Sequence, residues 1–328
     1  MQRRHFLAQA GALAATAATL GLASAPALAQ ADNFPQRPIR LIIGYTAGGS
    51  TDLPFRVLAE NASKIFGQPV IIENKPGAGG VLPAQLMQTT QPDGYTLAQV
   101  AMPVYRLPYT TKINWDPVKD LSYVINLAGY SFGLVVPVDS PIKTMQDYIA
   151  YARANPGRLT YGSPGSMTTL HLTMEELAMK QNVQFSHIPY KGNSESMQAL
   201  LGGHVMSVAD TPAWAQYVET GKLRLLSTWG EKRSARFPNV PTLKELGLGI
   251  VQTSPFGVVA PKGTDPKVVK KLHDGFKKAM EMQNYRDALA KFDMEPFYMG
   301  SEQYAHFAAD TVKKEKAIID KLGLNKPQ

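Results

Sequence analysis

The segment LSYVINLAGYSFGLVVPV, from Leu121 to Val138, decides the fold of this 328-residue chain. Its apolar run is broken by Asn126, Ser131 and several glycines, whereas a membrane-spanning helix needs about 18 or more unbroken apolar residues. The segment instead reads as two strands rich in β-branched residues. The first strand closes one series of strands and helices and the second opens another, so we expect the chain to cross between two lobes near residues 128–133.

The segments before this crossing alternate between short β-branched runs and amphipathic stretches of helical length. Between Asp52 and Phe66, apolar residues recur at a helical spacing until Gly67 ends the pattern. Strands separated by such helices predict parallel sheets built from right-handed crossovers. The expected elements are strands at 38–44, 69–74 and 95–100, a helix at 52–66 and a helix ending near residue 90.

A second series follows the crossing, with Thr144 as the N-cap of its first helix. The expected elements are helices starting near 144, 168, 194 and 213, and strands at 158–163, 184–188, 204–209 and 222–228. The last third of the chain returns to a single strand, FGVVAP, followed by helices at 265–282, 285–291 and 301–322. One strand with helices could hardly fold alone, so we expect this tail to pack on the first lobe after a second crossing near residues 248–256.

The predicted fold is therefore α/β with two hinged lobes and two crossings between them. Residues 30–130 and 250–328 are assigned to the first lobe, and residues 131–249 to the second. In open α/β sheets, ligands bind in the crevice outside the carboxyl ends of the strands. The loops that follow the strands are therefore the places to search for a site.

The N-terminus has the pattern of an export signal, predicted to span residues 1–29. An arginine pair, Arg3 and Arg4, precedes an apolar run that ends in small residues near Ala29. Phe6 and Leu7 complete a match to the twin-arginine form RRxFL, and a general-secretory signal that happens to contain two arginines is the alternative. Either signal predicts a periplasmic mature protein, cleaved near Ala29 and not embedded in the membrane.

Composition excludes several classes of function. The chain has no cysteine, which removes disulfides, thiolate nucleophiles and cysteine-ligated metals together. The formal net charge is +8, of which the leader arginines supply two. The late lysines, such as those in KVVKKLHDGFKK from Lys267 to Lys278, are typical of a solvated helix face. We expect no nucleic-acid partner, because such a partner would call for a concentrated basic stripe with aromatic residues.

The loop GYTAGGSTD, from Gly44 to Asp52, is the first candidate site. Its glycines permit close backbone approach, its hydroxyls can donate hydrogen bonds, and it leads into the positive N-terminal end of a helix, which suits an anion. The alternative is a structural turn in which Ser50 or Thr51 merely caps the helix. The next glycine loop, KPGAGG at 75–80, reads as a plain turn.

Known catalytic and cofactor motifs fail on this sequence. Leu82 stands where the dinucleotide fingerprint needs its third glycine, and neither the phosphate loop nor HExxH occurs. The stretch YGSPGSMTTLHL, which begins at Tyr161, breaks the nucleophile elbow at its first glycine. An exported hydrolase using Ser163 and His171 therefore remains only as a rival hypothesis. We expect no enzyme activity, no cofactor and no metal.

The same stretch supplies the second candidate site. A glycine turn and several hydroxyls face the start of a helix there, which suits a second anion or carbonyl contact. The hydroxyls are Ser163, Ser166, Thr168 and Thr169. One such loop on each lobe, facing each other across a hinge, would make a clamp for a carboxylate.

In order along the chain, these motifs make the sequence resemble the Bug family, the periplasmic solute-binding proteins of tripartite tricarboxylate transporters (TctC-like). The likeness covers essentially the whole mature chain. It is carried by FPQRPIRLII, AGGSTD, VIIENKPGAGG, PDGYTL, YGSPG, HIPYKG, GGHVMSVAD, GKLRLLST, RFPNVPTLKELG and GVVAPKGT.

The resemblance implies a two-lobed Venus-flytrap fold that captures a small carboxylate, either a dicarboxylate or an aromatic acid. The protein is expected to be a monomer and to deliver this ligand to the membrane permease. Delivery to a sensor kinase is the alternative. It also implies contacts from the start of the segment after HIPYKG. The ligand-binding residues implied are Tyr45, Thr46, Gly48, Gly49, Ser50, Thr51, Asp52, Ser163, Gly165, Ser166, Met167, Thr168, Thr169 and Asp210.

Some positions depart from the family pattern. Gly44 and Thr46 stand where relatives usually have prolines, and Met167 stands where they usually have a glycine. A methionine there removes backbone freedom and adds an apolar wall. Four apolar residues are expected to favour a hydrophobic or aromatic acid, with ordinary packing as the alternative: Tyr45, Met102, Phe132 and Met167.

Overall fold

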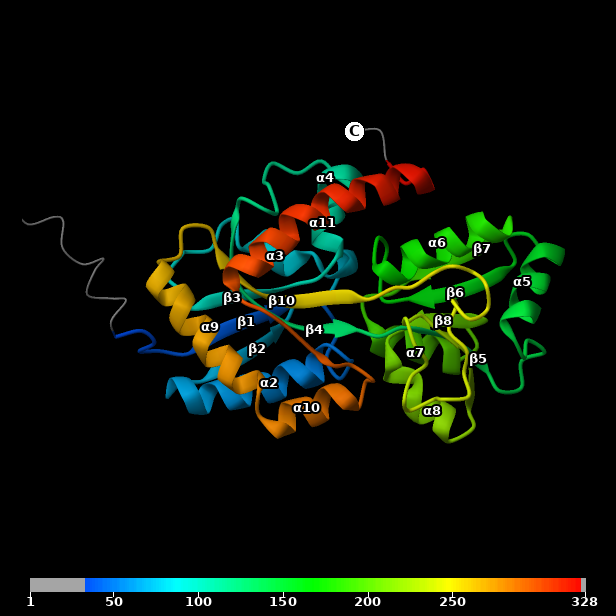
Figure 1. Cartoon of the computed structure of the whole chain (residues 1–328), viewed down its shortest axis with the longest axis horizontal. Helices are drawn as coiled ribbons and strands as arrows, with labels where there is room; N and C mark the ends of the chain where they lie inside the picture. The colour runs from blue at the N-terminus through cyan, green and yellow to red at the C-terminus, as the bar shows by residue number, and fades with distance from the viewer. Residues whose placement is uncertain (1–32, 326–328) are drawn as a thin grey trace, which may run out of the picture.

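A computed structural model describes residues 33–325, and it has two lobes that are each built on their own β-sheet (Figure 1). The predicted fold class is confirmed. The predicted export signal lies outside the described residues. Within the described part of the chain, no helix is both long enough and apolar enough to cross a membrane.

Lobe 1 contains a six-stranded sheet in the order β11-β4-β10-β3-β1-β2. Its strands are β1 (Ile39–Ile43), β2 (Val70–Asn74), β3 (Thr96–Val100), β4 (Leu121–Tyr130), β10 (Ser254–Pro261) and β11 (Pro296–Met299). Alternate residues of β1 point to opposite faces, so that Leu41 joins one apolar cluster and Ile42 the other. The sheet is therefore buried on both faces.

Helices cover both faces of this sheet (Figure 1). On one face pack α2 (Asp52–Phe66), α9 (Pro266–Met280) and α10 (Gln283–Ala290). On the other lie α3 (Leu82–Leu86), α4 (Pro103–Thr110) and α11 (Ser301–Leu322). A short 3₁₀ turn, η1 (Ala78–Gly80), precedes α3.

Lobe 2 contains a five-stranded sheet in the order β7-β6-β8-β5-β9. Its strands are β5 (Gly133–Pro137), β6 (Leu159–Ser163), β7 (Phe185–Pro189), β8 (Ser207–Asp210) and β9 (Leu223–Thr228). Its helices are α5 (Met145–Ala154), α6 (Thr169–Gln181), α7 (Asn193–Leu201), η2 (Pro212–Trp214) and α8 (Ala215–Glu219). The predicted N-cap Thr144 is confirmed, because it forms a capping box with Asp147.

The strands joined by helices run parallel as predicted, β1 with β2 and β3, and β6 with β7 and β8, but both sheets are mixed. β10 runs antiparallel to β3 and β4, and β5 runs antiparallel to β8 and β9. The crossover rule governs strands joined by a helix within one sheet, whereas β5 and β10 are entered directly from the other lobe. Their direction is set by the crossings.

The structure corrects two further expectations and adds one helix, α4, for which the sequence analysis gave no expectation. The C-terminal part contributes a second strand, β11, which pairs antiparallel with β4. Residues 103–110 form α4, which Pro103 begins and which keeps Pro108 inside it. The helix expected to end near residue 90 ends at Leu86. The helix α2, in contrast, has the predicted bounds and ends at Gly67 in the left-handed conformation.

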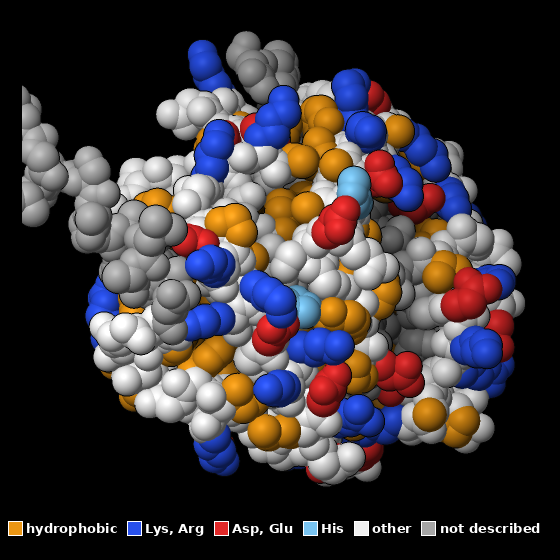
Figure 2. Space-filling model, turned by 60° about the vertical axis from the view of Figure 1, so that its left-hand side comes forward, with side chains coloured by type: hydrophobic (Ala, Val, Ile, Leu, Met, Phe, Trp, Pro, Cys, Tyr) orange, Lys and Arg blue, Asp and Glu red, His pale blue; other side chains and the backbone are white. Residues whose placement is uncertain are grey.

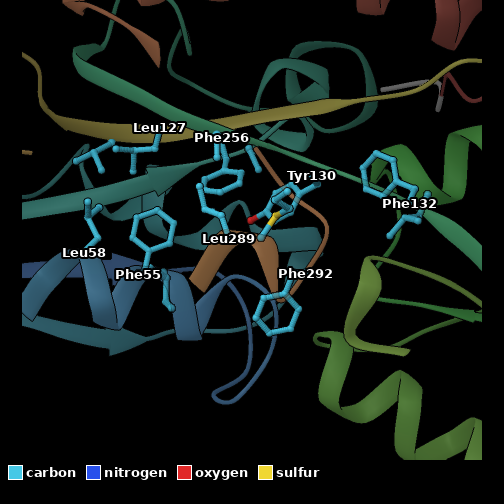
Figure 3. Close-up of a cluster of buried hydrophobic side chains, with 14 of the residues drawn as sticks. Phe55, Leu58, Leu127, Tyr130, Phe132, Phe256, Leu289 and Phe292 are labelled. Carbon is cyan, nitrogen blue, oxygen red and sulfur yellow. The ribbon is translucent and has the colours of Figure 1, made fainter. Parts of the chain in front are cut away.

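The two crossings are held by a row of aromatic side chains. The first crossing is the short link between β4 and β5, and the second is the segment between β9 and β10. Tyr130 stacks on Phe256 with ring centroids 4.3 Å apart, and beyond the link Phe132 contacts Trp229 at 5.8 Å. Figure 3 shows Phe55, Phe256 and Tyr130 inside lobe 1, and Phe132 past the link. One apolar cluster therefore continues from lobe 1 into lobe 2.

Charged side chains are interspersed on the surface shown in Figure 2, where acidic residues lie among the basic ones. Among the described residues, exposed ion pairs include Lys64 with Glu60 and Lys270 with Asp274. Exposed pairs of this kind contribute at most about 1 kcal/mol each. This face is solvated by charges of both signs.

Replacing Phe256 by alanine should lower the free energy of unfolding by about 3–5 kcal/mol, because the ring is fully buried against Phe55 and Tyr130 and leaves a cavity. Denaturant titration of the purified protein measures the change. Phe297→Ala is the control, since that ring is 46% exposed, and its effect should stay small. Equal losses for the two variants would contradict the packing described.

Candidate functional site

The loop between β1 and α2 brings a buried tyrosine and two hydroxyls to the face of lobe 1 that meets lobe 2. The Tyr45 hydroxyl donates to the carbonyl of Gly79 at 3.1 Å, and burial raises the pKa of this hydroxyl, which keeps it protonated. Ser50 and Thr51 directly precede α2 and are buried. The Thr51 hydroxyl lies 2.7 Å from that of Tyr130.

Asp52 shapes this loop from within lobe 1. Its carboxylate accepts hydrogen bonds of 2.9 Å from the Gly48 amide, the Arg56 guanidinium and the Asn74 side chain. Burial opposes ionisation of Asp52, but these hydrogen bonds outweigh it and hold the pKa below its ordinary value. Asp52 therefore stays charged and anchors the loop.

The loop between β6 and α6 supplies hydroxyls from lobe 2. Thr168 is the N-cap of α6: its Oγ1 donates to the Gly165 carbonyl at 2.8 Å and accepts from the His171 amide at 3.3 Å. Met167 has φ +58°, a left-handed conformation that favours glycine. A glycine at this position would relieve that strain.

Asp210 of lobe 2 holds a third set of polar residues, which lies between the end of β8 and the start of α7. It accepts hydrogen bonds from the Ser196 hydroxyl at 2.5 Å, from the Thr211 amide at 2.7 Å and from Asn193 Nδ2. Burial raises the pKa of Asp210 to about 7, and these donors oppose the rise. Asp210 is fully buried and holds Asn193, the first residue of α7, beside Thr211.

These groups converge on one cavity between the lobes. Its volume is only about 30 Å³, room for about one or two water molecules. Any larger molecule therefore needs the lobes to move apart before it can enter. The lining residues are Tyr45, Ser50, Thr51, Pro103, Tyr130, Phe132, Pro164, Thr168, Thr169, Leu170, Asn193, Thr211 and Ser254.

Four helices begin at this cavity. Ser50 and Thr51 precede α2, Pro103 begins α4, Thr169 begins α6 and Asn193 begins α7. A helix N-terminus carries partial positive charge on its free amides. The N-termini of α2, α6 and α7 therefore place partial positive charge beside the cavity without a lysine or arginine in its wall. The helix α4 adds no free amide, because it begins with a proline and its next two amides donate to the carbonyls of Ala101 and Met102.

Some of the sequence-predicted ligand contacts line the cavity and others do not. Those in the wall are Tyr45, Ser50, Thr51, Thr168 and Thr169. Outside it lie Thr46, Gly48, Gly49, Asp52, Ser163, Gly165, Ser166, Met167 and Asp210. Of the expected apolar wall, Tyr45 and Phe132 are in place, while Met102 and Met167 lie elsewhere.

Several residues of the site escaped the sequence analysis. Asn193 begins the segment after HIPYKG, which was implied only as a segment. Thr211 directly follows the predicted Asp210, so its position was a usable signal. Pro103 and Arg106 belong to α4, a segment to which the sequence analysis assigned no element.

The lobes contact one another directly around the cavity. Ser50 Oγ lies 2.6 Å from the Thr211 hydroxyl and donates to Asn193 Oδ1 at 3.1 Å. Ser194 donates to the Ala47 carbonyl at 3.0 Å. A Cβ added at Gly79, in the loop read as a plain turn, would lie 2.5 Å from the Ser166 carbonyl. The described form is closed.

A histidine pair lies behind the lobe 2 loop. Ser163 Oγ is 2.7 Å from His187 Nε2, and the rings of His171 and His187 stack with centroids 4.3 Å apart. Burial lowers the pKa of His171 to about 4, and that of His187 to about 3. The rival hydrolase paired Ser163 with His171, but the hydroxyl contacts His187 and is itself fully buried.

Comparison with known proteins points to one family. The sequence model described as tripartite tricarboxylate transporter family receptor, TctC, matches residues 54–324. A Cupriavidus necator protein, "UPF0065 protein in gbd 5'region", is 87% identical over the full length of both chains. TctC is a family of binding proteins and not of enzymes.

Two solved structures share the fold. The periplasmic binding protein BugD is 25% identical, with a TM-score of 0.85, over 90% of this chain and all of its own. The R. palustris protein Rpa4515, solved with adipate, is 26% identical, with a TM-score of 0.82, over 88% of this chain and 98% of its own.

Replacing Gly192 by alanine should push the lobes apart. Its Cβ would lie 2.4 Å from Thr46 Oγ1 across the seam, while its backbone is extended at φ 167° and accepts any residue. Small-angle X-ray scattering should give a larger radius of gyration than for the unchanged protein. Gly129→Ala is the control, because nothing lies within 4 Å of its added Cβ. An unchanged radius for Gly192→Ala would contradict this closed seam.

Stability should fall as the pH drops from about 6.5 towards 4. His171 and His187 have folded-state pKa values of about 4 and about 3, below the ordinary 6.5, so the unfolded chain takes up protons first. Each histidine contributes at most about 1.4 kcal/mol per pH unit. Asp210, with a folded-state pKa of about 7 against an ordinary 3.8, opposes this fall and offsets about one of the two histidines. Denaturant titrations between pH 7.5 and 4.5 should show a shallower fall for His187→Gln than for the unchanged protein. If the two proteins lose stability equally with falling pH, the lowered pKa of His187 would be contradicted.

Proposed function

This chain belongs to the tripartite tricarboxylate transporter family of receptors, TctC, and we propose that it captures a small carboxylate in the cleft between its lobes. The observation that carries the proposal is the convergence of three helix N-termini, those of α2, α6 and α7, on one cavity. Free backbone amides and aligned peptide dipoles at such ends favour an anion. The donors come from both lobes, so a bound carboxylate would bridge them.

The wall of the cavity favours a ligand with an apolar body. Hydroxyls and one amide occupy part of the wall, while Tyr45, Phe132 and Leu170 occupy another part. A carboxylate group needs hydrogen-bond donors, and the carbon chain or ring of the ligand would cover the apolar side chains. We therefore favour a dicarboxylate or an aromatic acid, and the adipate in Rpa4515 belongs to the first class.

Binding would proceed by closure of the lobes on the ligand. The lobe 1 loop binds one end of the ligand, and closure adds the hydroxyls of Thr168 and Thr169 together with the amide of Asn193. A ligand shifts the open–closed equilibrium only by its extra affinity for the closed form. Donors from both lobes supply that difference.

We place the working protein in the periplasm as a monomer, after removal of the leader near Ala29, by the twin-arginine or the general route. The closed, liganded form would be recognised by the membrane subunits of a tripartite tricarboxylate transporter, as expected of a TctC receptor. Transfer of the same form to a sensor kinase is the second candidate. The assignment of residues 30–130 and 250–328 to one lobe, and 131–249 to the other, follows the crossings.

A ligand titration tests the proposal. The purified protein, freed of bound ligand by unfolding and refolding, is mixed with aliphatic dicarboxylates, aromatic acids and amino acids while its melting temperature is followed. One carboxylate class should raise the melting temperature, because ligand at 100 times its Kd adds about 2.7 kcal/mol of stability. In Thr168→Ala/Thr169→Ala the affinity for that ligand should fall at least tenfold.

Thr89→Ala is the control for the double variant, because Thr89 is exposed on lobe 1 outside the cavity, and its affinity should match that of the unchanged protein. A response to amino acids but to no simple carboxylate would contradict the proposed ligand class. Unchanged affinity in the double variant would remove these two threonines from the site.

A further inference from the structure

Arg106 is a buried arginine at the seam between the lobes. It lies on α4, one turn after the cavity residue Pro103, and is only 3% exposed. Its Nε donates to Glu315 Oε2 at 2.6 Å, and Glu315, on α11, is itself buried. Both residues belong to lobe 1, so this ion pair does not depend on closure.

The other nitrogens of the guanidinium reach lobe 2. Nη1 donates to the Met167 carbonyl at 2.7 Å, and Nη2 donates to Thr169 Oγ1 at 3.2 Å. A guanidinium presents five N–H donors in a rigid plane, so one side chain can satisfy three acceptors at once. Arg106 thus joins α11 and α4 of lobe 1 to the loop that opens α6 of lobe 2.

We propose that Arg106 is the residue that locks the closed form and positions Thr169 toward the ligand. It acts as a positioning residue, since it is absent from the cavity wall. The role of Thr169 toward a carboxylate rests on the proposed function. The effect of Arg106 on closure does not depend on it.

The lock is preassembled in lobe 1. Because Glu315 holds Nε within the same lobe, opening the cleft breaks only two of the hydrogen bonds that Arg106 makes, those to the Met167 carbonyl and to Thr169 Oγ1. A charged donor makes stronger hydrogen bonds than a neutral one, and a donor already held in place loses little side-chain freedom on closure. The Met167 carbonyl is presented to Arg106 by the left-handed backbone at φ +58°.

Arg106 also fixes the direction of the Thr169 hydroxyl. A threonine hydroxyl has one hydrogen to donate and two lone pairs to accept. Since Thr169 Oγ1 accepts from Nη2 and lies in the cavity wall, its hydrogen is free to be donated into the cavity. The contact therefore favours an acceptor-only ligand group such as a carboxylate.

The helix α11, which carries Glu315, also contacts lobe 2 directly. α11 extends along the seam toward α6 (Figure 1), and Lys321 Nζ lies 3.5 Å from Glu176 Oε1. Lys321 is more than half exposed, so this pair contributes little. The buried Arg106–Glu315 pair is the stronger of the two links.

The test separates closure from folding and from binding. Arg106→Gln alone would leave Glu315 buried without its partner, a change that is strongly destabilising. The variant used is therefore Arg106→Gln/Glu315→Gln, which removes both charges. Because the natural chain has no cysteine, Lys112→Cys on lobe 1 and Asp139→Cys on lobe 2 carry spin labels that report the interlobe distance.

The double variant should melt as a folded protein, show a larger share of the longer interlobe distance without ligand, and lose at least tenfold in affinity for the carboxylate found by titration. Arg106→Lys keeps the charge but cannot reach three acceptors at once, so its affinity and its closed share should be intermediate. It serves as the second readout if the double variant does not fold.

Glu60→Gln/Lys64→Gln is the matched control, because it removes an exposed ion pair within α2, and it should change neither distance nor affinity. A closed share and an affinity equal to those of the unchanged protein, in either Arg106 variant, would overturn the inference. If no carboxylate binds the unchanged protein, the proposed function fails, while the ligand-free distances still decide whether Arg106 holds the lobes together.

Discussion

The chain passes between its lobes twice, and the rest of the structure depends on this constraint. The two links lie side by side in the aromatic row that runs from Phe256 and Tyr130 to Phe132 and Trp229. Because both links lie in one apolar cluster, the lobes can move only by bending about this region. Independent rotation of a lobe would expose the buried side chains of the cluster to water. The loops beside the links therefore meet in a fixed register, and the cavity forms where they meet, with Tyr130, Phe132 and Ser254 of the links in its wall.

Buried carboxylates prepare the site without facing it. Asp52 holds the lobe 1 loop through the Gly48 amide, and Asp210 holds Asn193 and Thr211 in lobe 2. A carboxylate in the wall itself would repel an anionic ligand, whereas one placed behind the wall orients donors toward it. The same division applies to Arg106, whose charge acts through Thr169.

Much of this could be predicted from the sequence, and the failures have physical causes. The period of the apolar residues gave α2 its bounds, and the two glycine loops led to Ser50, Thr51, Thr168 and Thr169. The antiparallel direction of β5 and β10 escaped prediction because these strands are oriented by the crossings. Arg106 escaped because its partners Glu315 and Met167 are distant in sequence and no local pattern marks a contact across the seam.

In the closed form, the side chains of the cavity bind one another. The Ser50 hydroxyl engages Thr211 and Asn193, and these are the same groups that a carboxylate would need. These hydrogen bonds within the protein compete with those to a ligand. The affinity for a ligand would therefore depend on replacing existing hydrogen bonds rather than on adding new ones. A molecule too short to bridge the lobes would break these hydrogen bonds without replacing them. The closed form would therefore select against ligands that are too short.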